Sequence, residues 1–195
     1  MASTLKINNL DTASGTTITV ASGKTLNASN GFTPPSGHIV QVVHSKRAAA
    51  SGRLSFTTGA AATFANALGM SLNITPASTS STMLIRLAFR YASTASSDNV
   101  IRIVRTVGGS ATNLYPVDTA GGLGNIYYAN GSNNTYYAHI AYEDISFDYL
   151  DSPSTAAQIT YQVQFANSGG TLSIGSRGDN GNYRDNTITV MEIAG

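Results

Sequence analysis

Hydrophobic and polar residues alternate along most of this 195-residue chain, which is the pattern of half-buried β-strands. Clusters of Gly, Asn, Asp, Ser and Pro separate the alternating runs. From residue 37 onward the predicted strands are 39–45, 53–57, 69–75, 83–91, 100–107, 136–150, 159–165, 171–174 and 187–193. Strands of this number and spacing, with no βαβ alternation, predict an all-β head of the β-sandwich or jelly-roll kind.

Turn signals lie between these runs. The predicted turns are 77–81, 108–110, 121–124, 130–134, 151–154, 168–170 and 179–182. One segment is ambiguous, because the Ala-rich stretch 60–68 is compatible with a short helix while Thr63 and Phe64 leave that assignment open.

A short repeat occupies the beginning of the chain. Gly15, Gly23 and Gly31 are spaced eight residues apart, and each follows a Ser or an Asn. Short alternating stretches follow the glycines, with Ile18 and Leu26 at equivalent positions. A turn followed by a very short strand is the unit from which β-solenoid stalks are built.

About three such units cannot enclose a core in one chain, because each offers only one or two large apolar residues. We therefore predict that residues 1–35 form an intertwined β stalk in which identical chains, usually three, share their apolar residues around an axis. Pro34 and Pro35 mark the boundary with a head at 36–195. The alternative is a flexible Gly/Ser linker. The residues predicted to line the stalk of the homotrimer are Ile18, Val20, Leu26 and Phe32.

Composition excludes several classes of function. The chain has 11 Lys and Arg against 10 Asp and Glu, so no broad basic field attracts nucleic acid. Its apolar runs are far shorter than the roughly 20 residues of a membrane span, and the start has no signal-like apolar run, so neither membrane insertion nor self-encoded export is expected. With no Cys, disulfides and thiolate metal sites are excluded.

Five segments together resemble one family. They are 3–10 (STLKINNL, followed by Ser14-Gly15 and 17–19), 37–43 (GHIVQVV), 72–76 (LNITP), 147–161 (containing LDSPST) and 187–193 (TITVMEI). In this order they are similar to tail-fibre and minor structural proteins of bacteriophages that infect marine bacteria, cyanobacteria especially. The resemblance implies a homotrimeric component of the virion surface with a short stem and a β-sandwich head. It leaves open whether the capsid or the tail carries the protein.

The polar residues do not predict a catalytic or metal site. His38 and His44 would lie about 20 Å apart along one strand, so they cannot share a metal ion within one chain. A ring with one histidine from each chain could bind an ion. The alternative is that the three histidines, His139 included, are ordinary surface or interface residues. Asp144 and Asp148 would lie about 13 Å apart on one strand face, farther than a glycosidase pair. No catalytic residue, metal ligand or cofactor is therefore predicted, and the protein is not expected to be an enzyme.

Tyrosine is the more suggestive residue. Tyr127, Tyr128, Tyr136 and Tyr137 flank a loop that contains Asn130-Gly131, a favoured tight-turn pair. Tyr with Asn, Ser and Gly is typical of recognition surfaces, so this loop is a candidate for binding a host surface glycan. The alternative is that each doublet places one ring inward and one outward on a strand.

Two functions follow from the sequence. The first is a phage virion structural protein, either a short trimeric fibre or a capsid decoration, whose partners are its own copies and other virion proteins of the capsid or tail. The second is a receptor-binding tail-fibre module that recognises a host glycan.

Overall fold

In the computed structural model the chain separates into two compact units, Met1–Thr33 and Pro34–Gly195. The structure describes residues 21–24, 34–49, 54–56, 63–93, 98–115, 125–128, 141–167, 171–175 and 184–195. In the first unit, the described residues form one turn, in which the Lys24 amide donates to the Ala21 carbonyl at 3.1 Å. Gly23, the second glycine of the repeat, takes a φ of +76° there.

The described part of the second unit consists of antiparallel strands and contains no α-helix. The strands are β1 (Ile39–Arg47), β2 (Leu54–Phe56), β3 (Ala65–Ile74), β4 (Thr82–Ser93), β5 (Asp98–Val107), β6 (Ser110–Tyr115), β7 (Asn125–Tyr128), β8 (Ala141–Asp151), β9 (Ile159–Asn167), β10 (Leu172–Ile174) and β11 (Asn186–Ile193). The predicted all-β class is confirmed. No helix in the described ranges is long and apolar enough to cross a bilayer.

The first sheet is arranged around β4. Strand β8 pairs with the whole length of β4 on one side, and β11 and then β10 pair with it on the other. Strand β1 pairs with β11, and β2 pairs with β10. The four long strands therefore lie in the order β1-β11-β4-β8, and among the described long strands β1 and β8 lie at the two edges of this row.

The second sheet has the order β3-β9-β5, and β6 and β7 share the other side of β5. Gly108 and Gly109 connect β5 to β6 as a two-residue hairpin, and both take the positive φ that such a turn requires. Side chains of β1 join the two sheets along one side, because Gln41 donates to the Thr75 carbonyl at 2.7 Å and Ser45 donates to the Gly69 carbonyl at 3.2 Å.

One hydrophobic core lies between the sheets. Alternate residues of β4 and β11 from the first sheet and of β5 and β9 from the second are fully buried, among them Ile85, Leu87, Ile103 and Val163. Across the core, the rings of Phe89 and Phe165 meet edge to face with centroids 5.3 Å apart. Each such apolar side chain contributes about 1.5–3 kcal/mol by its burial.

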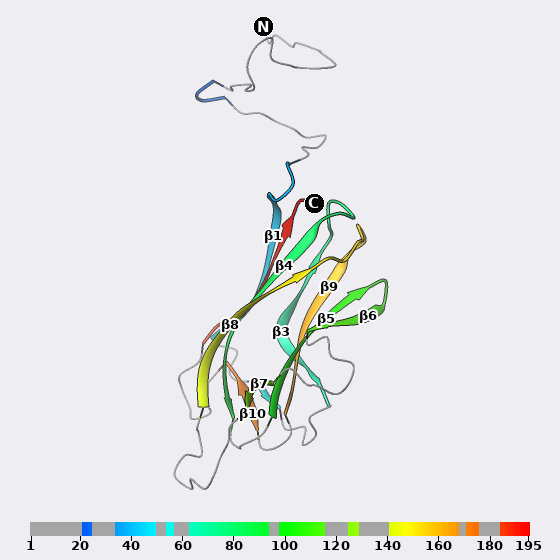
Figure 1. Ribbon diagram of the computed structural model, residues 1–195. Helices are drawn as coiled ribbons and strands as arrows, with labels where there is room; N and C mark the ends of the chain where they lie inside the picture. The colour runs from blue at the N-terminus through cyan, green and yellow to red at the C-terminus, as the bar shows by residue number, and fades with distance from the viewer. Residues whose placement is uncertain are drawn as a thin grey trace. The chain divides into compact units, whose positions relative to one another are not determined.

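The two ends of this sandwich-like unit carry different connections. The start of β1 and the C-terminus lie at the upper end in Figure 1, and β7 and β10 lie at the lower end. At the upper end, Gly37 donates to the Ala194 carbonyl at 2.7 Å and Ala194 donates to the His38 carbonyl at 2.8 Å. The segment that follows Pro34 is therefore tied to the C-terminus.

Some sequence predictions need correction. Residues 65–68 of the possible helix 60–68 belong to β3, which continues past an irregularity in its pairing with β9. His38 lies before β1, so it does not share a strand with His44. Strands β6 and β7 were not predicted; β6 buries only Leu114 among its described side chains.

Candidate interaction face

The outer face of the first sheet carries a row of apolar side chains. Strand pairing places Val42 of β1 opposite Met191 of β11, Met191 opposite Leu84 of β4, and Leu84 opposite Leu150 of β8. Val42 is 56% exposed and Leu150 is 57% exposed, while the two residues between them are half-buried. The row thus crosses four strands from one edge of the sheet to the other.

This row extends toward the end of the unit at which Pro34 lies. A bulge between Ile39 and Gln41 returns Ile39 to the outer face, where it pairs with Ile193. Ile39 is 59% exposed. We call Ile39, Val42, Leu84, Leu150, Met191 and Ile193 the apolar band. Single exposed apolar residues are ordinary on protein surfaces, but contiguous sets mark places of contact.

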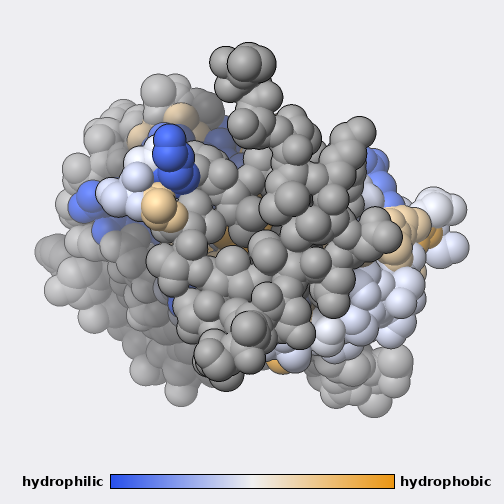
Figure 2. Space-filling model, turned by 90° about the horizontal axis from the view of Figure 1, so that it is seen from above, coloured by the Kyte–Doolittle hydropathy of each residue, from blue (hydrophilic) through white to orange (hydrophobic). Residues whose placement is uncertain are grey.

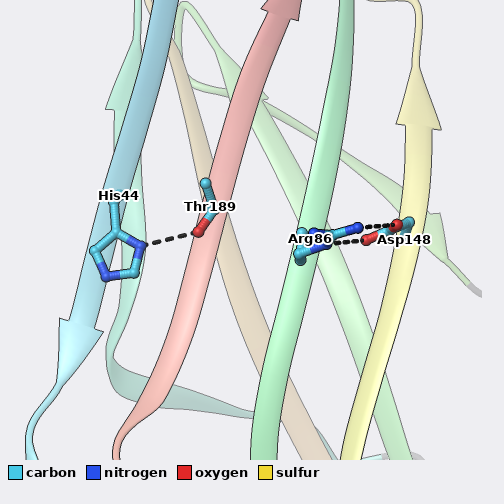
Figure 3. A network of polar contacts seen from close by, with 4 residues as sticks. All are labelled: His44, Arg86, Asp148 and Thr189. Atoms are coloured by element: carbon cyan, nitrogen blue, oxygen red, sulfur yellow. Dashed lines mark hydrogen bonds and ion pairs between the residues drawn. The ribbon is translucent and has the colours of Figure 1, made fainter.

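A row of polar side chains lies directly beside the apolar band. It consists of His44, Thr189, Arg86 and Asp148 on β1, β11, β4 and β8, and we call it the polar row (Figure 3). His44 Nδ1 lies 2.9 Å from Thr189 Oγ1, and two nitrogens of Arg86 each donate to an oxygen of Asp148 at 2.8 Å. The hydrogen bond from Arg86 holds the pKa of Asp148 below its ordinary value, so the pair is ionised and neutral as a whole.

The outer face of the second sheet is different, because its polar side chains are bonded to one another. Gln164 donates to Asn66 at 2.7 Å and accepts from Arg102 at 2.9 Å, while the Arg102 guanidinium stacks 3.8 Å from the centre of the Phe64 ring. Thr160 donates to Asn73 at 2.7 Å farther along the same face. Such a ladder is typical of a sheet face that remains in water.

Figure 2 looks down on the molecule from the end near Pro34. Among the coloured residues in that view, pale and blue ones predominate, and orange apolar residues form small separate areas.

A buried carboxylate stands behind the band at the end near Pro34. Glu192 of β11 is fully buried, and its two oxygens accept from the Ala77 amide at 2.7 Å and from the side-chain amide of Gln41. Burial opposes ionisation, but the hydrogen bonds from the Gln41 side chain and the Ala77 amide lower the pKa of Glu192 below its ordinary value. Glu192 thereby joins β11, β1 and the connection between β3 and β4.

Acidic residues lie on both faces of β8. Asp148 belongs to the polar row, whereas Asp151 is 5% exposed and accepts from Arg105 at 2.7 Å and from the Tyr161 hydroxyl at 2.6 Å. Burial, and then the bond to Asp151, raises the pKa of Tyr161 above its ordinary range. These contacts hold structural elements together, and within the described ranges no three potential metal ligands gather.

Most of the residues for which the sequence predicts a role in assembly or recognition lie outside the described residues. These are Ile18, Val20, Leu26 and Phe32 of the stalk, Tyr136 and Tyr137 of the recognition loop, and His139. Only the backbone of Tyr127 and Tyr128 is described; it forms part of β7 and pairs with Asn99 and Asp98 at the start of β5. The roles of these residues remain predictions.

The sequence analysis did not find the apolar band. Val42, Leu84 and Met191 each lie in a predicted strand, where the alternation alone leaves open which face is inside. Their assembly into one row depends on the pairing of four strands that are distant in the sequence. The only signal available was the presence of large apolar residues at both alternating positions of these strands.

Comparisons with known proteins do not identify a family for this chain. No family model matches the chain, and no curated protein does. A chain from the structure of infectious bursal disease virus, Gx strain, aligns with 80% of this chain and 39% of its own length, at 14% identity and a TM-score of 0.33. The crystal structure of the infectious bursal disease virus VP2 subviral particle gives 13% identity and a TM-score of 0.36 over the same shares. This chain thus spans 39% of those chains, and at such scores the likeness does not establish a common fold.

Proposed function

We propose that this protein is a non-catalytic structural component of a bacteriophage particle, either a short homotrimeric fibre or a capsid decoration. The observation that carries the proposal is the apolar band, which covers four strands on the outside of a unit that has a separate hydrophobic core among its described residues. A face of this kind is expected in a protein whose task is assembly. The antiparallel all-β architecture and the resemblance of the sequence to phage fibre proteins support the same function.

In this proposal residues 1–35 are the trimeric stalk and 36–195 are the head, of the sandwich or jelly-roll kind. The chain divides at Thr33 and Pro34, which is compatible with separate tasks for the two parts. Ile18, Val20, Leu26 and Phe32 would meet on the axis of the stalk. The partners are other copies of the chain and other proteins of the capsid or tail, and the location is the surface of the virion.

The test is the mass of the full chain in dilute solution, measured by light scattering with and without the changes Ile18→Asp and Leu26→Asp. The unchanged chain is expected to be a trimer, and the double variant is expected to dissociate because buried carboxylates at the axis would be unpaired. Thr19→Asp with Asn27→Asp adds the same charges at the alternate positions and should remain trimeric. A stable, folded monomer of the unchanged chain would refute the proposal.

A second function has one observation in its favour. The backbone of Tyr127 and Tyr128 lies at the end of the head opposite Pro34, since β7 pairs with the first residues of β5. An end that faces away from the attachment point is where a receptor-binding module would contact a host glycan. The same chain would then serve as the tip of a tail fibre.

A further inference from the structure

We propose that the apolar band is the surface through which the heads of neighbouring copies pack, with the β1 edge of one copy against the β8 edge of the next around the threefold axis. This inference rests on the proposed trimer and adds its geometry. The first sheet would face the axis, and the bonded polar ladder of the second sheet would face water.

The position of the band favours another copy of the same chain as its occupant. Ile39, its first residue, follows Pro34 by five positions. In a trimer held by residues 1–35, the segments around Pro34 of the three copies lie near a common axis. The surface beside them is therefore brought against the other copies.

The small size of the band also favours another copy of the chain as the partner that covers it. A stable interface between free proteins uses about 20–30 residues on each side, and the band has far fewer. A contact this small is sufficient only when a tether supplies a high effective concentration, in the millimolar range for short links. The stalk would provide that tether to a second copy, whereas a partner that diffuses freely would lack it.

The charges beside the band do not oppose a contact between copies. On the β1 edge the polar row ends in His44, next to Lys46, and on the β8 edge it ends in Asp148. A threefold ring is built from heterologous contacts, so the β1 edge of one copy meets the β8 edge of the next and not its own counterpart. Asp148 is already paired with Arg86, and Lys46 is paired with Asp185 at 3.0 Å, so contact leaves no charge without a partner.

Cysteine cross-linking tests this arrangement, because the chain has no Cys of its own. Val42 and Leu150 lie on opposite edges of four paired strands, about 14 Å apart by strand spacing. That separation exceeds the roughly 7 Å limit between the Cα atoms of a disulfide, so Val42→Cys with Leu150→Cys cannot bond within one chain. Both positions are more than half exposed, which makes the substitutions mild.

The full-length double variant, oxidised while dilute, is expected to run as a covalent trimer in denaturing electrophoresis and to return to monomer on reduction. Each single variant should remain monomeric in the gel. The matched control is Asn73→Cys with Ala111→Cys. These two residues lie at opposite ends of a row of four paired residues across the second sheet, Asn73, Thr160, Thr106 and Ala111. This control variant should not cross-link.

Light scattering on the same samples separates the two proposals. A trimer in which Val42→Cys with Leu150→Cys fails to cross-link would overturn the band contact and leave the proposed function standing. Cross-linking of Val42→Cys alone would indicate two copies face to face and would overturn the ring arrangement. A monomer by light scattering would refute the trimer itself and, with it, this contact.

Discussion

At the scale of single residues, Glu192 makes the clearest prediction. Its carboxylate is fully buried and accepts from two donors, the Ala77 amide and the Gln41 side chain. Glu192→Gln retains the shape but only one acceptor oxygen, so one of the two donors loses its partner at the buried carboxylate. We expect the variant to lose about 1–3 kcal/mol of stability at pH 7, measured by denaturant unfolding.

The effect should depend on pH. The pKa of Glu192 is lower in the folded protein than its ordinary value of 4.5, so the stabilisation is complete above that value and is lost as pH falls through the folded pKa. The difference between Glu192→Gln and the unchanged protein should therefore shrink in acid. Asp148→Asn, in an exposed ion pair, is the control and should change stability little. A constant difference down to strong acid would contradict this role of Glu192.

At the scale of structural elements, the irregularity in β3 depends on Gly69. Its φ is +79°, and a Cβ placed there would lie 3.2 Å from Cβ of Arg47 on β1. Gln162 of β9 also donates to the Ala67 carbonyl at this point, at 3.2 Å. The irregularity is thus held by β1 on one side and by β9 on the other.

We expect Gly69→Ala to cost about 1–2 kcal/mol for the left-handed backbone, and more for the contact with Arg47. Gly109→Ala is the matched control, since its φ is +85° but no atom lies within 4 Å of the added Cβ. Urea unfolding of both variants should place the midpoint of Gly69→Ala below that of Gly109→Ala. Equal midpoints would mean that β1 moves aside without cost.

At the scale of the whole molecule, the distribution of residues between the two ends of the head bears on recognition. Pro34 and the C-terminus lie at one end, and β7 with the backbone of Tyr127 and Tyr128 lies at the other. Three weak sites repeated by a threefold axis would raise apparent affinity for a cell surface by about a hundredfold or more. This arrangement would make a shallow tyrosine patch useful for attachment.

If the tyrosines bind the host, Tyr128→Ala with Tyr136→Ala should reduce adsorption of otherwise identical particles by about that factor while the protein remains folded. Thr112→Ala with Asn113→Ala, at two exposed positions of β6, is the control and should adsorb normally. Normal adsorption of the tyrosine variant would assign the tyrosines to packing and leave assembly as the function. Plaque assays and binding to whole cells provide the readout.

The all-β class and most of the long strands follow from the pattern of residues along the chain. The predicted strand 187–193 differs from β11 by one residue, and 100–107 differs from β5 by two, because both are rich in β-branched residues and β11 also alternates strictly between core and surface. The turn at Gly108 and Gly109 was equally accessible, since few residues other than glycine adopt two consecutive positive φ angles readily.

Features that depend on the pairing of distant strands emerge only in the folded chain. Strand β6 is mostly polar and exists because β5 offers it an edge, and residues 65–68 are extended because β9 pairs with β3 on both sides of the irregularity. The apolar band arises in the same way, since Val42, Leu84 and Leu150 become neighbours only through the register of β1, β11, β4 and β8. Local alternation specifies that a strand has two faces, but hydrogen bonds between distant strands fix which residues lie side by side on each face.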